Sequence, residues 1–550
     1  YYSTYEPYQE VGIDHIPHME QRTKQRMVTI GSGPIRIGQG IEFDYGCVHA
    51  VMAIRAAGMD AILINNNPET VSTDFDTSDR LYFDPLTNEC VSEILLREKA
   101  HGILLQFGGQ TAINLAIPLE KRLPHLSSKG ADVSILGTTV DGIDEASDRE
   151  RFEAFAKKHG LRMPNGATGT SSEDIRKAVD QIGFPVLIRP SYVLGGRGME
   201  ILSNESQLEA YLKEAYLAPD KPLLVDEYLG HATELDVDAA ADGKEVLVGA
   251  IMEHLEEAGI HSGDSTCFIP TQNISEEMLK RVDEQTRIIG LGLKIKGCFN
   301  IQFAIQGDDL YVLEVNPRSS RTVPFVAKSS GLPLAKIAAN VTIGIPLSEQ
   351  TIPKRTSGQI CVKAPVFPFI KLRGLDPAPG PEMKSTGEVY GSDISADVAY
   401  LKARLATEVP VAADGGVYLT VRDEDKHELA PIAKELYDLG FTLYATPGTA
   451  DILRDHDILV TTVYRITERK HPDALDLMRQ GDISFIVNVP TISGGAVRDG
   501  NMMRRLAVEL NIPFVTTIRG ARMEAAAIRA LIEKEIIPRK LEVHYDSKFL

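Results

Sequence analysis

The stretch 300–318, NIQFAIQGDDLYVLEVNPR, carries the strongest signal in the sequence. It holds two runs of alternating apolar and polar residues on either side of Gly307-Asp308-Asp309, a pattern typical of a β-hairpin. With these three residues as the loop, Gln306 would pair with Leu310. This register then determines which side chains of the two strands face each other.

The same register gathers polar side chains on one face of the hairpin. Gln302 would lie opposite Glu314, about 5 Å away, and Asn316 shares the face of Glu314 because it is two residues further on. Three oxygen ligands, one of them anionic, suit Mg²⁺, which prefers hard oxygens and keeps positions open for waters and phosphates. Arg318 follows, where it could meet a transferring phosphoryl group. A single strand glutamate is usually just solvated, but these four residues together predict metal–phosphate chemistry.

Further polar groups occur in the surrounding segment, residues 146–385. Its strand-like runs alternate with period two and predict an antiparallel sheet with covering helices. Glu227 and Glu234 fall on two of these runs, where a carboxylate could accept a hydrogen bond from a ribose hydroxyl. His261 lies in an irregular polar stretch, and a lone histidine of this kind more often has a structural role.

Two glycine-rich loops are candidates for phosphate binding. The loop 195–198, GGRG, follows a strand with Arg189; its N–H groups and the guanidinium could neutralise a triphosphate, although an ordinary hairpin turn fits the same residues. The loop 31–40, GSGPIRIGQG, lacks the Lys-Ser/Thr of a P-loop, and no acidic residue ends the next strand as in a dinucleotide fingerprint. We therefore interpret it as a tight turn into a helix.

Outside the central segment, strand and helix patterns alternate. Residues 26–145 predict a parallel sheet with helices on its faces. The Pro- and Gly-rich stretch 367–383 is predicted to lead out of the central segment, and residues from about 386 onward predict helices and then a second α/β unit. The 550 residues exceed what one core normally holds, so we expect three or four domains.

Composition narrows the class of protein. The apolar share of 43% and the charged share of 25% are typical of a globular protein. The net charge of −19 argues against a nucleic-acid or anionic membrane surface. No apolar run reaches the roughly 18 to 20 residues of a membrane span, and no signal peptide is visible. The five cysteines show no CxxC pairing, so we expect a reduced, cytoplasmic protein without structural zinc.

Five stretches carry a resemblance to a known family: IGSGPIRIGQGIEFDYGCVHA, IRPSYVLGGRGME, IMEHLEEAGIHSGDST, LEVNPRSSRTVPFVAK and GPEMKSTGEV. They resemble the carboxy-terminal half of the large subunit of carbamoyl-phosphate synthase, through nearly all of residues 1–400 and more loosely to the end. The opening YYSTYE is similar to the join between that subunit's two halves, so we expect the chain to be the back part of a longer protein.

The resemblance implies an α/β multidomain fold. It comprises a Rossmann-like preATP-grasp domain, an α+β ATP-grasp domain and a methylglyoxal-synthase-like α/β regulatory domain. We expect these at 26–145, 146–385 and 410–550. Residues 1–25 would be the tail of a preceding oligomerisation region or linker, and 386–409 a linker.

The resemblance also implies an activity. The chain would be an ATP-grasp ligase that phosphorylates carbamate to carbamoyl phosphate with ATP and Mg²⁺ or Mn²⁺, with two ions expected and K⁺ as a further ion. Its partners would be the amino-terminal half of the large subunit, a glutaminase small subunit, an oligomer of the full enzyme and a nucleotide effector, with no nucleic acid and no membrane. The choice between pyrimidine and arginine synthesis, the oligomeric state and the activity of the isolated chain stay open.

The family's site residues can be transferred position by position. The catalytic arginines would be Arg318 and Arg189. The ATP contacts would be Arg149, Arg189, Glu227, Leu229, Glu234, Gly259, Ile260, His261, Ser262, Gln302 and Glu314. The metal ligands would be Gln302, Glu314 and Asn316, the patch that the hairpin register predicts independently.

The resemblance further implies an effector site. Its residues would be Lys426, Thr446, Thr449, Arg465 and Asn488, with Arg465 in place of a lysine and Pro490 where a threonine is common. This predicts a phosphate pocket but neither the identity nor the sign of the effector. In the family's ornithine site Glu256, Asp264 and Thr516 match, but Ala364 stands where a glutamate is expected, which argues against ornithine control.

Two other interpretations stay open. Another ATP-grasp carboxylate ligase would share the Gln302, Glu314 and Asn316 patch but would need no effector domain. Alternatively, the chain would be a non-catalytic regulatory or assembly module.

Overall fold

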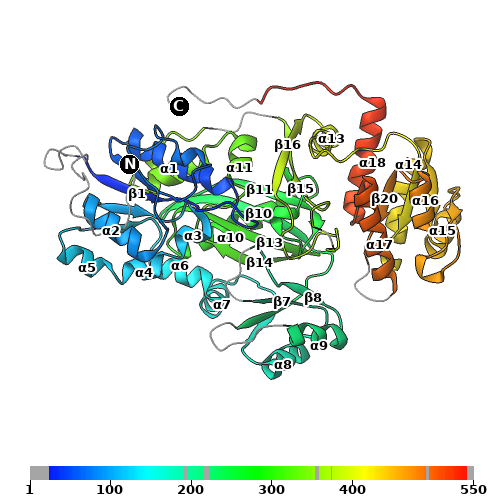
Figure 1. The fold of residues 1–550 in the computed structure, drawn as a ribbon, viewed down its shortest axis with the longest axis horizontal. Coiled ribbons are helices and arrows are strands. Elements are labelled where there is room, and N and C mark those ends of the chain that lie inside the picture. Colours follow the sequence, from blue (N-terminus) through cyan, green and yellow to red (C-terminus); the bar gives the residue numbers. More distant parts are fainter. Residues whose placement is uncertain are drawn as a thin grey trace.

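Three sheets follow one another along the long axis of the molecule, and a fourth, smaller sheet projects to one side (Figure 1). The structure, a computed structural model, describes residues 24–190, 195–214, 222–353, 358–372, 374–490 and 495–541. Within these residues, no helix combines the length and apolar character that crossing a bilayer requires.

The first sheet is fully parallel, in the order β3-β2-β1-β4-β5. The inner strands β1, β2 and β4 are almost entirely buried, as expected where helices cover both faces, whereas the edge strand β5 is partly exposed. The predicted parallel sheet is therefore confirmed, with the short edge strand β3 as an addition. The strands are β1 (Arg26–Ile30), β2 (Asp60–Ile64), β3 (Arg80–Tyr82), β4 (Gly102–Leu104) and β5 (Ser134–Leu136), and the helices are α1 (Glu42–Ala56), α2 (Asn88–Glu98), α3 (Gly109–Ile113), α4 (Ala116–Glu120), α5 (Leu123–Ser128) and α6 (Val140–Ser147).

The central sheet has seven antiparallel strands, in the order β14-β13-β10-β11-β12-β15-β16. One hydrophobic cluster joins it to the first unit, because α1 residues such as Ala50 pack with Met252 and Leu334. The strands are β10 (Thr233–Asp242), β11 (Val246–Glu257), β12 (Cys267–Ile269), β13 (Lys296–Gln306), β14 (Asp309–Asn316), β15 (Ile360–Val366) and β16 (Gly387–Asp393), with helices α10 (Glu276–Gly292), α11 (Val323–Ser330) and α12 (Leu334–Thr342).

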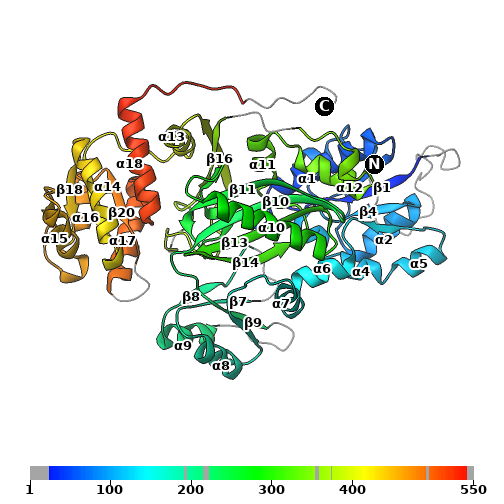
Figure 2. The same cartoon turned by 180° about the vertical axis from the view of Figure 1, so that it is seen from behind.

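The strands predicted together as one antiparallel region form two separate sheets. The smaller sheet, in the order β6-β9-β7-β8, lies on the β14 side of the central sheet in both opposite views (Figures 1 and 2). It has its own apolar core, which includes Ile175, Val186 and Val225. Its elements are β6 (Gly166–Gly169), β7 (Val186–Pro190), β8 (Glu200–Leu202), β9 (Leu223–Glu227), α8 (Ser172–Ile182) and α9 (Glu205–Glu214), preceded by α7 (Arg149–Lys158).

Residues 386–409, expected as a linker, contain regular structure instead. β16 pairs with β15 from Gly387 to Asp393, so the chain returns to the central sheet after the Pro- and Gly-rich stretch. Helix α13 (Ala396–Ala406) then buries Val398, Ala399 and Leu401. The pairing partner of β16 lies on β15, outside the range 386–409, so the expected layout gave no indication of this strand. The domain limits themselves stay predictions.

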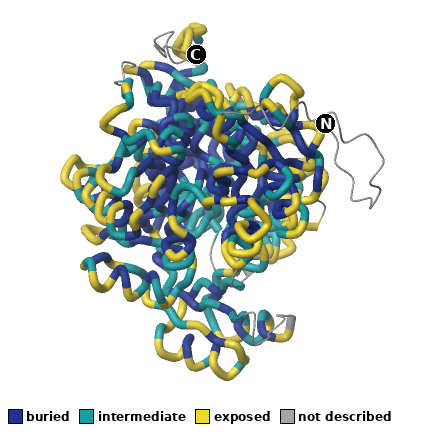
Figure 3. Tube along the Cα trace, turned by 90° about the vertical axis from the view of Figure 1, so that its left-hand side faces the viewer, coloured by how far each residue is buried: buried dark blue, intermediate teal, exposed yellow. Residues whose placement is uncertain are grey.

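The last unit is again a parallel sheet, in the order β19-β18-β17-β20-β21. It lies at the end of the molecule opposite the first unit (Figure 1). Tyr400 of α13 and Ala527 of α18 share a buried cluster that attaches it to the rest. Figure 3 shows buried segments gathered in the interior of the molecule and exposed segments mainly at its periphery. Its elements are β17 (Gly416–Thr420), β18 (Thr442–Ala445), β19 (Thr461–Thr462), β20 (Phe485–Asn488), β21 (Phe514–Val515), α14 (Lys426–Asp438), α15 (Pro447–Asp455), α16 (Ala474–Gln480), α17 (Gly495–Leu510) and α18 (Ile518–Glu533).

Candidate active site

The hairpin β13–β14 brings the predicted metal patch together, although the predicted loop is wrong. Gln306 pairs with Asp309, so the loop has two residues and the expected Gln306–Leu310 pair does not form. A bulge beyond this point adds one residue to β14 and shifts the register by one. As a result Gln302 does lie opposite Glu314, as predicted.

Asn316 and Arg318 extend this patch by direct contacts. The Asn316 amide donates to Glu314 Oε1 at 2.7 Å, and Arg318 Nη2 donates to Asn316 Oδ1 at 3.0 Å. The first unit also holds Arg318, because its Nε donates to Gln110 Oε1 at 3.2 Å and its guanidinium lies 5.6 Å from the centre of the Phe43 ring. Burial lowers the pKa of Arg318 to about 10, so the side chain is still a cation at neutral pH.

A buried acidic group lies next to the patch on β10. Glu234 is 2% exposed, and burial raises its pKa to about 7, against the opposing effect of the nearby His254. His254 of β11 lies 3.9 Å from the Glu234 carboxylate and 3.1 Å from Asp236 Oδ2. The N–H of Gly259 also hydrogen-bonds the Glu234 carboxylate. Glu234 is therefore poised between its neutral and ionised forms near pH 7.

The turn after β11 contains four of the predicted ATP contacts: Gly259, Ile260, His261 and Ser262. Gly259 has φ +92°, and a Cβ there would lie 2.7 Å from the Tyr228 ring, so only glycine fits. His261 Nδ1 accepts from Gly263 N at 3.1 Å and lies 3.1 Å from Arg321 Nη2. Burial and Arg321 hold the pKa of His261 well below its usual range, so the ring is neutral.

The smaller sheet supplies two cations that share one carboxylate. Arg149 Nη1 lies 2.7 Å from Asp226 Oδ1, and Arg189 Nε donates to Asp226 Oδ2 at 3.1 Å. Sequence reasoning missed Asp226, because only the pairing of β9 with β7 brings it beside Arg189, and only the packing of α7 near β6 brings Arg149 to it. The adjacent Glu227 accepts from Asn165 Nδ2 at 2.7 Å.

The apolar Leu229 lies between the two sheets in the sequence. It is buried in a small cluster with Ala232, Ala258 and Ala304, and Ala304 pairs with Glu234. Leu229 is therefore close to the Glu234 side of the patch. The Glu234 carboxylate therefore has this apolar cluster beside it.

The glycine loop 195–198 lies against both the first unit and the stretch before β16. A Cβ on Gly195 would lie 3.3 Å from Gly38 Cα, so the opening glycine loop touches this second one. Gly196 has φ +68°, and a Cβ there would collide with the Pro381 carbonyl. The glycines are required by close backbone contact, and the remainder of the preceding segment, 191–194, lies outside the described residues.

The predicted effector residues follow the carboxyl ends of neighbouring parallel strands, where ligands bind in open α/β sheets. Lys426 Nζ lies 2.6 Å from Asp423 Oδ1 and 2.9 Å from the position of a Cβ on Gly448. Thr446, the residue before α15, donates to Thr449 Oγ1 at 3.3 Å. The structure therefore brings Lys426, Thr446 and Thr449 together at the amino terminus of α15.

The other two predicted effector residues are Arg465 and Asn488. The pKa of Asp423 is lowered mainly by Lys426 and to a smaller extent by the charge of Arg465. Asn488, at the end of β20, accepts a hydrogen bond from Arg504 of α17. Arg504 is buried, at 2% exposure, and sequence reasoning missed it.

The residues of the family's ornithine site have other partners in this chain. Asp264 accepts from the backbone N–H groups of Lys384 and Ser385 at 2.8 and 2.9 Å, and Glu256 accepts from Thr266 N at 2.6 Å. Ala364 is buried within β15. These acidic groups therefore serve local structure.

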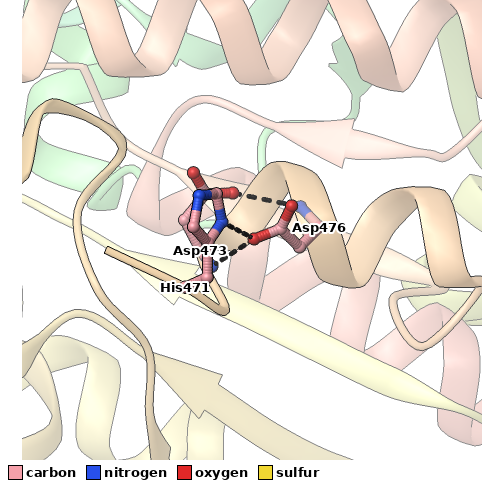
Figure 4. Close-up of side chains that lie close together, drawn as sticks. All are labelled: His471, Asp473 and Asp476. Carbon is pink, nitrogen blue, oxygen red and sulfur yellow. Dashed lines mark hydrogen bonds and ion pairs between the residues drawn. The ribbon is translucent and has the colours of Figure 1, made fainter. Parts of the chain in front are cut away.

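One cluster of metal-ligand type occurs among the described residues: His471, Asp473 and Asp476 (Figure 4). Asp473 Oδ1 accepts from Asp476 N, and Asp476 Oδ2 accepts from Asp473 N, both at 3.0 Å. This is a capping box at the start of α16. His471 Nδ1 pairs with the same Asp476 carboxylate, so the cluster is explained as a helix cap.

Comparison with known proteins places this architecture in a class. A carbamoyl phosphate synthase preATP-grasp domain model matches residues 23–145, a carbamoyl-phosphate synthase L chain ATP binding domain model matches 148–350, and an MGS-like domain model matches 428–516. The fold is similar to an ADP complex of N5-carboxyaminoimidazole ribonucleotide synthetase, with TM-score 0.54 and 13% identity over 70% of this chain and 96% of that one. It is also similar to the biotin carboxylase domain of Hydrogenobacter thermophilus 2-oxoglutarate carboxylase, solved with MgADP and bicarbonate, with TM-score 0.53 and 16% identity over 70% and 90%. The chain thus has preATP-grasp, ATP-grasp and MGS-like units, which confirms the predicted fold class.

Relatives with higher sequence identity identify the protein family. The chain is 46% identical to the carbamoyl phosphate synthase large chain, C-terminal section, of Methanocaldococcus jannaschii, over 98% of this chain and 87% of that one. It is 48% identical to the carbamoyl phosphate synthase large chain of Methanosarcina acetivorans, over 97% of this chain and 49% of that one. The chain belongs to the carbamoyl phosphate synthase large-chain family. It spans about half the length of most of the curated relatives it matches.

Proposed function

We propose that this chain transfers the γ-phosphoryl group of ATP to carbamate, giving carbamoyl phosphate and ADP. The observation that carries the proposal is the contiguous patch of Gln302, Glu314, Asn316 and Arg318 on the β13–β14 hairpin. Membership of the large-chain family supports carbamate as the acceptor. In the step itself, a carbamate oxygen would attack the γ-phosphorus in line. The bond between that phosphorus and the bridging oxygen, which leaves with ADP, would break at the same time.

The arginines of the site would neutralise charge as it moves onto the leaving group. Arg318 is held by Asn316 and by Gln110 of the first unit, so its position is fixed before substrate arrives. Arg189 and Arg149 are held by Asp226 on the smaller sheet. Positioning and charge neutralisation are the main requirements of phosphoryl transfer.

Gln302, Glu314 and Asn316 fit a divalent cation, because they offer oxygen donors with a single carboxylate in a partly buried patch. When bound there, Mg²⁺ or Mn²⁺ would screen the phosphate oxygens of the nucleotide. The solved ATP-grasp neighbour with MgADP supports Mg²⁺ with adenine nucleotide. Two ions, and K⁺ elsewhere, remain expectations from the family resemblance.

The nucleotide would lie along the buried edge of the patch. Glu234 and the Gly259–Ser262 turn are adjacent, since the Gly259 N–H bonds the Glu234 carboxylate. Glu227 and Glu234 are the carboxylates we assign to ribose hydroxyls, with Leu229 beside the base. The glycine loop 195–198 would lie over the phosphates.

We assign the partners from the family resemblance, and the greater length of most relatives supports an amino-terminal half. An amino-terminal half would make carbamate from bicarbonate, ATP and ammonia, and a glutaminase small subunit would supply the ammonia. The phosphate pocket of Lys426, Thr446, Thr449, Arg465 and Asn488 would bind a nucleotide effector. The product would feed pyrimidine or arginine synthesis. The MGS-like match favours this function over an unregulated ATP-grasp ligase.

The reverse reaction tests the proposal. The full chain with MgADP and carbamoyl phosphate should form ATP, read with a luciferase assay. Glu314→Gln keeps the shape of the side chain but removes the only carboxylate of the metal patch, so it should lower the rate by at least about a hundredfold. Glu349→Gln, at an exposed position outside the patch, is the matched control and should keep the wild-type rate. Retained activity in Glu314→Gln would refute the metal assignment.

A further inference from the structure

One segment connects the last, MGS-like unit, which we call the regulatory unit, to the proposed nucleotide site. Its first residue, Asp376, accepts two hydrogen bonds from Arg504 of α17, from Nε at 2.8 Å and from Nη2. The remaining nitrogen of this guanidinium, Nη1, donates to Oδ1 of Asn488 in the predicted effector pocket. Arg504 is therefore shared between the pocket and the segment 376–385.

The segment is held as a rigid turn. Lys384 Nζ donates to the carbonyls of Asp376 and Ala378 at 3.2 and 2.5 Å, which closes the segment on itself. At its far end, the N–H groups of Lys384 and Ser385 donate to the buried carboxylate of Asp264. A displacement of Asp376 is therefore transmitted along the segment, because both ends are tied through Lys384.

The middle of the segment supports the nucleotide site directly. The Gly380 carbonyl accepts from His261 N at 2.9 Å, within the turn assigned to ATP. Met383 N donates to the Gly195 carbonyl at 2.9 Å, and the Pro381 carbonyl packs against Gly196. The glycine loop and the His261 turn thus both contact the backbone of residues 380–383.

We propose that Arg504 is a positioning residue for the nucleotide site, acting on the glycine loop and the His261 turn through the segment 376–385. The inference rests on the proposed function, since it assumes that these two loops bind adenine nucleotide. Because Asn488 holds Nη1 of the guanidinium whose Nε and Nη2 hold Asp376, an anion in the effector pocket that engages Asn488 would change how firmly Arg504 holds Asp376. This gives the regulatory unit a physical connection to nucleotide affinity.

The test compares MgADP binding by isothermal titration calorimetry in the full chain and three variants. Arg504→Met and Asp376→Asn should each raise the Kd at least tenfold, and Arg504→Lys, which keeps the charge but loses the two-armed contact, should lie between. Arg522→Met is the matched control, because its ion pair with Glu428 lies within the regulatory unit, and its Kd should stay within twofold of the wild type.

Two readouts separate positioning from loss of folding. Loss of folded protein lowers the calorimetric stoichiometry, whereas loss of positioning raises the Kd at unchanged stoichiometry. In the reverse reaction the KM for ADP should rise while kcat stays within threefold. If Arg504→Met does not fold, Asp376→Asn and Arg504→Lys decide the question. A Kd within twofold of the wild type in any folded variant of Arg504→Met or Asp376→Asn overturns the inference.

The proposed function fails separately. If the wild-type chain binds MgADP but makes no ATP, the catalytic proposal is refuted and the Kd comparison still decides the role of Arg504. If the wild-type chain does not bind MgADP, both proposals are refuted.

Discussion

Glu234 is the residue of the site whose protonation is most sensitive to its surroundings. Burial raises its pKa to about 7, His254 opposes this rise, and the negative charges of Asp236 and Glu314 add to it. A carboxylate that accepts from ribose hydroxyls must be ionised. With Glu234 assigned to the ribose hydroxyls, we expect the free protein below pH 7 to hold a proton there that nucleotide binding releases.

The affinity for ADP should consequently rise with pH between 6 and 7, by up to about tenfold from this group, and level off above it. Calorimetry in buffers of different ionisation enthalpy measures the released proton. Glu234→Gln should lose this part of the pH dependence. The ADP phosphates titrate equally with both proteins, so subtracting the pH profile of Glu234→Gln from that of the wild type removes their contribution. Glu227→Gln is the matched control and should keep it. Equal slopes for wild type and Glu234→Gln would contradict the assignment.

At the scale of the element, the start of α16 gives a test of the capping interpretation. Asp473 accepts from the N–H of Asp476, a contact that typically contributes about 1 kcal/mol. Asp473→Ala should therefore lower the melting temperature of the regulatory unit by a few degrees, as measured by differential scanning calorimetry. Because the carboxylates serve the helix, EDTA and Mg²⁺ should leave the transition unchanged. A transition that Mg²⁺ raises in the wild type and not in Asp473→Ala would show a metal site instead.

The β13–β14 hairpin shows what local patterns can and cannot predict. Alternation along both strands predicts that Gln302, Glu314 and Asn316 share one face, and they do. The loop length was wrong, since a two-residue turn and a bulge together give the same pairing at Gln302. The bulge is not visible in the alternation, because the extra residue, Leu313, continues the apolar run that ends at Val312.

At the scale of the whole molecule, the parallel first and last sheets and the antiparallel centre could be predicted from periodicity. Contacts between distant segments could not. Asp226 meets Arg189 because β9 lies beside β7, it meets Arg149 of α7 across 77 positions of sequence, and Arg504 meets Asp376 across 128 positions. Such pairs have no local signal, so the sequence predicted the chemical groups of the site but missed what holds them.

The regulatory unit should bind a phosphorylated ligand independently of the catalytic patch. A nucleoside monophosphate such as UMP should raise the melting temperature of the full chain, because it supplies a phosphate to Lys426 at the amino terminus of α15. Lys426→Ala should remove this shift, while the matched variant Lys434→Ala, whose partner Asp438 is on the same helix, should retain it. If no phosphorylated ligand produces a shift, the pocket assignment is refuted.

The central claim is that this chain itself carries out phosphoryl transfer between carbamate and adenine nucleotide. Phosphorus NMR of the full chain with MgADP and carbamoyl phosphate tests it most directly, since both phosphorus signals are observed at once. The carbamoyl phosphate signal should decline while an ATP γ-phosphate signal grows in equal amount. Folded protein that binds MgADP yet produces no γ-phosphate signal would contradict it.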